Sequence, residues 1–151
     1  MKILPSTNLN LIQKKNTTFK STFVPNKTLE KAFVKAEETS NKRFLLSVRK
    51  LLNDGKNRIL ELKEGIYASK DDKLYTLTSL IDSDGNKRKY VNFPYLFDKT
   101  SDSLIASDAI LLVCEATKKH IYQREYAEIT NEKCQADLLE LKQQIFQNSN
   151  N

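Results

Sequence analysis

The sequence predicts an α+β domain: a small antiparallel β-meander packed against an N-terminal helix and a long C-terminal helix, with a basic N-terminal arm. Three observations predict this class. Residues Ser103–Gln147 contain no Gly and no Pro, and their apolar or small residues recur mostly three and four apart, as on one helix face. Residues 25–53 show a similar pattern. Residues 58–93 instead hold β-branched and aromatic runs between turn residues.

The chain length bounds the domain organisation. A chain of 151 residues normally forms one domain and can bury a core without metals or disulfides. We expect residues 1–24 to form a flexible or extended basic arm and residues 25–151 to form a single α+β domain. The arm holds four Lys and no acidic residue. Phe19 and Phe23 are poorly suited to a fully solvated tail, so we expect part of the arm to dock.

The first helix should begin at Pro25–Asn26, where Asn26 is a suitable N-cap. Thr39–Asn41 weakens its middle, and we expect a kink or a split there. Asn53–Gly55 should end the helix, because Gly or Asn readily adopts the left-handed conformation that terminates helices. The apolar stripe of this helix is Leu29, Phe33, Ala36, Phe44, Val48 and Leu51.

The β part should begin with two short strands on either side of Glu64–Gly65, one starting at Ile59 and one at Ile66. Leu74–Ile81 carries apolar residues on both faces, which predicts a central strand. Asp82–Asn86 should be a hairpin turn because Asp-Gly favours positive φ, and Lys87–Phe93 should return as the partner strand. A calcium-binding loop starting at Asp82 would need Gly at position six and an acid at position twelve, where the sequence has Lys87 and Phe93.

The C-terminal stretch, for which Ser101–Ser103 supplies N-cap side chains, allows two structures. A continuous helix would be about 65 Å long, so its end, about residues 131–147, would project. The alternative is a break at Thr130–Asn131, where two poor helix formers sit together. Within this stretch, Ala109–Cys114 is apolar all round, which predicts burial on more than one side.

The two cysteines, Cys114 and Cys134, are expected to be reduced thiols of a cytoplasmic protein. On a continuous helix they would lie about 30 Å apart, and a disulfide needs α-carbons within about 7 Å. Neither cysteine belongs to a CxxC pair or lies near a histidine at a metal-binding spacing, so we expect no zinc site.

Charge is distributed unevenly along the chain. Residues 1–58 carry 13 Lys/Arg and 4 Asp/Glu, a net charge of +9, whereas residues 59–151 carry 12 and 15, a net charge of −3. This asymmetry has two interpretations. The basic half binds an anionic partner, or the two halves attract each other.

Motifs for catalysis are absent. The sequence contains no P-loop, GxGxxG, GxSxG or HExxH motif. The single histidine, His120, follows two lysines, and no nucleophile or orienting acid accompanies it in sequence. We therefore predict a protein that is not an enzyme and that has no cofactor and no metal.

Two functions remain. The first is a non-catalytic accessory or interaction protein, which could be a component of a larger assembly or a homo-oligomer. It would bind a protein partner through the arm or through the C-terminal helix, whose narrow apolar stripe is Cys134, Leu138, Leu141 and Ile145. The alternative is a small basic nucleic-acid-binding regulatory protein, whose phosphate and stacking contacts would come from Lys14, Lys15, Lys42, Arg43, Lys87, Arg88, Lys89 and Tyr90. No apolar run approaches the ~20 residues of a membrane-spanning helix, so we expect no membrane partner.

Overall fold

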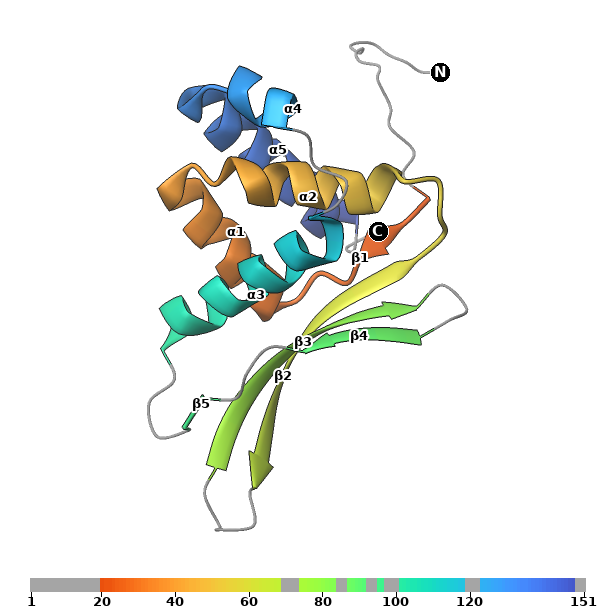
Figure 1. Ribbon diagram of the computed structural model, residues 1–151, viewed down its shortest axis with the longest axis vertical. Coiled ribbons are helices and arrows are strands. Elements are labelled where there is room, and N and C mark those ends of the chain that lie inside the picture. Colours follow the sequence, from red (N-terminus) through yellow and green to blue (C-terminus); the bar gives the residue numbers. More distant parts are fainter. Residues whose placement is uncertain are drawn as a thin grey trace.

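The computed structural model describes residues 20–68, 74–83, 87–91, 95–96, 101–118 and 123–148. It confirms the mixed helix-and-sheet class. Figure 1 shows a group of helices on one side of a twisted sheet, and two long strands extend beyond that group. The elements are β1 (Thr22–Phe23), α1 (Lys27–Thr39), α2 (Lys42–Asn53), β2 (Ile59–Ala68), β3 (Leu74–Ser83), β4 (Lys87–Val91), β5 (Tyr95–Leu96), α3 (Asp102–Thr117), α4 (Gln123–Glu128) and α5 (Asn131–Asn148).

The N-terminal helical segment is split into α1 and α2. The side chain of Asn26 caps α1, accepting a hydrogen bond from the backbone N–H of Leu29 at 2.9 Å. The same amide donates to the carbonyl of Leu62 at 2.8 Å, which joins the start of α1 to β2. Ser40 ends α1 in the left-handed conformation (φ 49°), and Asn41 caps α2. The chain therefore turns where Thr39–Asn41 weakens the helical pattern.

The sheet is mixed, because β1 runs parallel to β2 while every other pairing is antiparallel. The prediction of a purely antiparallel meander is therefore wrong at this edge. The strand order is β1-β2-β3-β4, and β5 also pairs with β3. β3 is thus the central strand, as predicted. The β1 pairing uses Thr22 and Phe23, so the last residues assigned to the arm belong to the fold.

Two strand boundaries differ from the prediction. β2 is one ten-residue strand through Glu64–Gly65, because β3 pairs with it along its whole length. β3 continues to Ser83, so Asp82 lies opposite Leu60 in the ladder and not in the turn. Ser83 pairs with Lys87, which confirms the hairpin between β3 and β4. The turn itself, 84–86, lies outside the described residues.

The C-terminal stretch is not one continuous helix, so that prediction is wrong. It forms α3, α4 and α5, and residues 119–122 lie outside the described part. The break expected at Thr130–Asn131 is present. The Thr130 hydroxyl accepts a hydrogen bond from the backbone N–H of Lys133 at 3.1 Å, so Thr130 caps α5 as a new helix. α5 does not project, because it packs against α1 and α2 (Figure 1).

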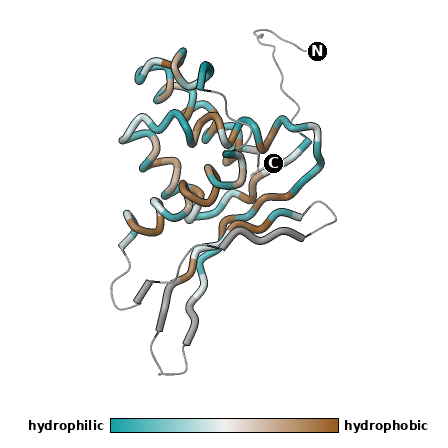
Figure 2. Tube along the Cα trace, viewed as in Figure 1, coloured by the Kyte–Doolittle hydropathy of each residue, from teal (hydrophilic) through white to brown (hydrophobic). Residues whose placement is uncertain are grey.

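The core lies between the helices and one face of the sheet. Phe33 of α1 and Phe44 of α2 meet edge to face, with ring centroids 5.2 Å apart. Leu62 and Leu80 are paired neighbours on β2 and β3, and both are buried. Figure 2 shows hydrophobic residues along the central helices and along the part of the sheet beside them. The fold therefore buries one face of each main element, as a two-layer α+β domain requires.

Candidate interaction surface

The predicted partner-binding stripe on α5 is buried within the chain. Cys134 and Leu138 are 0% exposed, Leu141 is 5% exposed, and Ile145 packs partly buried against the core. The reason is the break at Thr130, which lets α5 fold onto α1 and α2. Three polar contacts hold this packing: Lys142–Glu37 at 2.9 Å, Gln135 to the Glu37 carbonyl at 3.3 Å, and Arg49–Asp137 at 2.7 Å. These apolar side chains are therefore unavailable at the surface.

The predicted nucleic-acid-binding residues do not form one described surface. Lys14 and Lys15 lie outside the described residues. Lys42 and Arg43 lie in the first turn of α2, whereas the segment Lys87–Tyr90 lies in β4. Figure 1 shows these two places well separated. The Lys42 ammonium lies 5.4 Å from the centre of the Tyr126 ring, so part of its charge faces an aromatic of its own chain.

Basic residues of the N-terminal half form ion pairs with acids of the C-terminal half. Lys31 pairs with Glu64 at 3.3 Å and with Asp102 at 3.1 Å. Burial by itself would lower the pKa of Lys31, but these two carboxylates raise it above its ordinary value. Thr28 also donates to Glu64 at 2.6 Å. Part of the positive charge of the N-terminal half is therefore compensated by acids of the C-terminal half.

The cysteines are both free and lie on different helices, Cys114 on α3 and Cys134 on α5. Burial raises the pKa of both thiols, and the hydrogen bond of Cys114 with Ser47 offsets this only in part. A raised pKa lowers the thiolate fraction at neutral pH and therefore the reactivity. No group of three or more His, Cys, Asp or Glu residues within the described ranges is arranged to hold a metal ion. His120 lies outside those ranges.

A buried charged cluster was missed by the sequence reasoning. Arg58 is 6% exposed and donates to Asp82, itself 1% exposed, at 2.7 Å. Arg58 also pairs with Asp54. The only signal in the sequence was one arginine between a helix end and a strand, and this pattern does not identify a buried ion pair. The cluster joins α2, β2 and β3, and we interpret it as structural.

The outer side of α3 exposes two leucines. Leu104 is 43% exposed and Leu111 is 50% exposed, although the sequence predicted burial around Ala109–Cys114. Their seven-residue spacing places them on one face of the helix. Between them, the Ser107 hydroxyl donates to the Ser103 carbonyl at 2.9 Å. We call Leu104, Ser107 and Leu111 the outer α3 strip.

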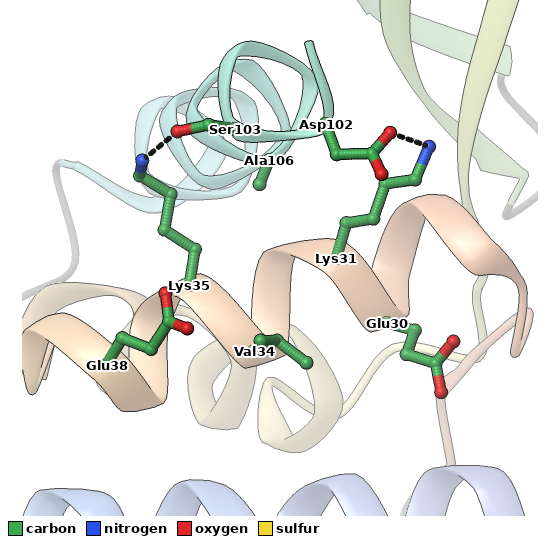
Figure 3. Close-up of a pocket in the computed structure, with 8 residues that line it drawn as sticks. All are labelled: Glu30, Lys31, Val34, Lys35, Glu38, Asp102, Ser103 and Ala106. Atoms are coloured by element: carbon green, nitrogen blue, oxygen red, sulfur yellow. Dashed lines mark hydrogen bonds and ion pairs between the residues drawn. The ribbon is translucent and has the colours of Figure 1, made fainter.

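A pocket of about 320 Å³ lies between α1 and the start of α3 (Figure 3). Two contacts span it: Lys35 to the Ser103 hydroxyl at 2.6 Å, and Lys31 to Asp102 at 3.1 Å. Its lining residues are Glu30, Lys31, Val34, Lys35, Glu38, Asp102, Ser103 and Ala106. Val34 and Ala106 are its only apolar lining residues within the described part of the chain, and the other six are polar or charged.

No family model, no curated protein and no solved structure matches the chain. Among the helices that the structure describes, none has the length and apolar character needed to cross a membrane. Function must therefore be argued from the surface of the molecule.

Proposed function

We propose that the protein is a non-catalytic accessory protein that binds a macromolecular partner, and that this partner is another protein. The observation that carries the proposal is the outer α3 strip. Fully burying a leucine is worth about 1.5–3 kcal/mol relative to leaving it exposed. Leu104 and Leu111 are already about half buried, so covering each one contributes roughly half of that value, and the two together contribute to a modest interface.

The polar group between the leucines suits the same role. A buried hydroxyl without a partner would oppose binding. The Ser107 hydroxyl already donates within α3, so a partner can cover it without leaving an unsatisfied donor. The strip spans about 10 Å along the helix, since each residue rises about 1.5 Å. This length matches a small hot-spot region at the centre of an interface.

Site-specific photo-crosslinking in the cells that naturally make the protein tests this proposal. A photoreactive amino acid would replace Leu104 or Leu111 in the full chain. Leu139 of α5 is the matched control, because it is 44% exposed and lies on another helix. The expected result is one discrete protein adduct from both α3 positions and none from the α5 position. Absence of an adduct at α3, or the same adducts at all three positions, contradicts the proposal.

A substitution provides the second readout. Leu111→Glu should abolish the adduct formed from position 104, because a charge on the strip opposes burial. The half-exposed position tolerates this change, so the circular dichroism spectrum should stay unchanged. An adduct that survives Leu111→Glu would show that the strip is not the interface.

A further inference from the structure

Two contacts between α1 and α3 frame the pocket between these helices, and we call the framed opening the socket. Lys31 and Lys35 are one helical turn apart on α1, and both reach across to α3 (Figure 3). Ala106 of α3 lies between these two contacts in the same view. Val34 of α1 also lines the socket and is 43% exposed. Ala106 is only 3% exposed, so the exposed apolar surface of the opening comes from Val34, with charged residues around it.

The charges on the rim of the socket are not balanced. The ammonium groups of Lys31 and Lys35 are engaged by acceptors of the chain itself. Glu30 and Glu38 also line the pocket, and neither forms an ion pair within the described part of the chain. Lys35 keeps its positive charge, because its acceptor is the neutral hydroxyl of Ser103. The three acids that line the pocket still exceed its two lysines by one charge, so the site is net negative although the whole chain has a net charge of +6.

The spacing of these residues is regular. Glu30, Val34 and Glu38 follow one another at four-residue intervals along α1, so they lie on one side of that helix. The α-carbons of the two glutamates are about 12 Å apart, because eight residues rise about 1.5 Å each. A second helix lying along α1 would present matching side chains at positions i, i+4 and i+8.

We propose that this socket binds a helical segment of a partner protein with a basic residue, an apolar residue and a second basic residue at four-residue intervals. The apolar side chain would enter between the Lys31 and Lys35 contacts and pack on Val34 and Ala106. The two basic side chains would pair with Glu30 and Glu38. The inference rests on the proposed function, since it names the chemistry of a partner protein, but it concerns a different surface from the outer α3 strip.

The same charges argue against anionic ligands. The lining residues carry three carboxylates and two ammonium groups, so the net negative charge disfavours a phosphate group. A volume of about 320 Å³ is also at the lower end of the range for small-molecule pockets, which is about 300–1,000 Å³. One aliphatic side chain of a partner fits within such a space, and helix-in-groove binding of this kind uses anchors at helical spacing.

A designed peptide tests the inference with the full-length protein. The probe is a fluorescently labelled helical peptide that carries Lys, Leu and Lys at four-residue intervals, with a control peptide in which both Lys are Glu. Fluorescence anisotropy would measure binding up to about 1 mM protein. We expect the basic peptide to bind and the acidic peptide not to bind. No binding of the basic peptide, or equal binding of both peptides, would overturn the inference.

Paired charge reversals make the test specific. The variant Glu30→Lys/Glu38→Lys should weaken binding of the basic peptide at least about tenfold, because two attractions become repulsions. The matched control is Glu132→Lys/Glu140→Lys, two exposed acids of α5 with the same eight-residue spacing. It changes the net charge equally and should weaken binding less than about twofold. Equal weakening by both variants would indicate only general electrostatic attraction and would refute the socket.

The apolar contact has its own variant. Val34→Asp should weaken binding of the basic peptide although it adds a negative charge. The leucine of the peptide would then meet a carboxylate in place of an apolar surface. Tighter binding to this variant would refute the socket as an apolar site. Failure of the peptide experiments leaves the crosslinks from positions 104 and 111 as the independent test of the proposed function.

Discussion

At the scale of single residues, the buried ion pair between Arg58 and Asp82 is the most consequential feature. Their 2.7 Å contact joins the start of β2 to the end of β3. The backbone N–H of Arg58 also donates to the Ser21 hydroxyl at 3.1 Å, and its carbonyl accepts from the N–H of Thr22 at 2.9 Å. One residue therefore connects β1, β2 and β3. Removing Asp82 would leave the buried Arg58 with only the more exposed Asp54 as a carboxylate partner, which is costly for a desolvated charge.

Replacement of Asp82 by Ala should lower the free energy of unfolding by at most about 3–5 kcal/mol, the usual cost of breaking a buried ion pair, because Arg58 keeps Asp54 as a partner. Asp54→Ala is the matched control, since it removes the other carboxylate that pairs with Arg58. The Asp54 side chain is 18% exposed and that of Asp82 is 1% exposed. The control should therefore cost less than half as much. Urea unfolding followed by circular dichroism measures both, and an equal or reversed order would contradict this account.

At the scale of elements, local sequence signals predicted where helices end, but they did not predict how the elements pack. Asn26 and Thr130 cap their helices because a short polar side chain there can satisfy a free backbone N–H. The sequence also indicated that β3 is central, because both faces of that strand are apolar. The pairing of β1 with β2 was not predictable, because two residues carry no strand periodicity.

The candidate surfaces were predicted poorly for a physical reason. An apolar stripe such as Cys134–Ile145 indicates that a helix face is buried, but it does not say whether the chain itself or a partner covers it. Here the chain itself covers the stripe, because the break at Thr130 lets α5 pack against α1 and α2. Conversely, the exposure of Leu111 depends on which sides of α3 the other helices and the sheet cover. The socket was also invisible in sequence, because its two walls are about 70 residues apart.

The break between α1 and α2 supplies a prediction at this scale. Ser40 adopts the left-handed conformation, with φ 49° and ψ 53°. A non-glycine residue there costs roughly 1–2 kcal/mol, and glycine avoids this cost while losing some backbone entropy. Ser40→Gly should therefore raise the free energy of unfolding by about 0.5–1 kcal/mol. Thr39→Gly, one residue earlier in the helix, should lower it. Thermal unfolding would compare the two, and a change of the same sign would contradict the role of Ser40.

At the scale of the whole molecule, basic residues of the N-terminal half attract acidic residues of the C-terminal half. Four ion pairs in the described part of the chain join bases of residues 1–58 to acids of residues 59–151: Lys31–Glu64, Lys31–Asp102, Arg49–Asp137 and Arg58–Asp82. The exposed pairs each contribute little to stability, about 0–1 kcal/mol. Their larger effect is on recognition, because a lysine held by a carboxylate of its own chain is a poorer ligand for phosphate.

We therefore predict weak binding to nucleic acid, the alternative function that the composition suggests. Tight electrostatic binding needs several cations on one surface, each releasing counterions from a phosphate. Lys31, Arg49 and Arg58 are paired with acids of the chain, and the predicted contacts Lys42–Arg43 and Lys87–Tyr90 lie in different elements, α2 and β4. The socket adds two glutamates that form no ion pair within the described residues. We therefore expect a dissociation constant weaker than about 100 μM at about 0.15 M salt for single-stranded and double-stranded oligonucleotides.

Fluorescence anisotropy of labelled oligonucleotides of about 20 nucleotides, titrated with protein at two salt concentrations, measures this directly. Micromolar binding that falls steeply with salt would contradict the prediction and favour the nucleic-acid function. In that case, Lys42→Glu/Arg43→Glu would show whether the start of α2 contributes, because both residues lie in its first turn. Weak binding, combined with discrete crosslinks from α3, would indicate that the charge of the N-terminal half serves the fold and that the apolar strip serves the partner.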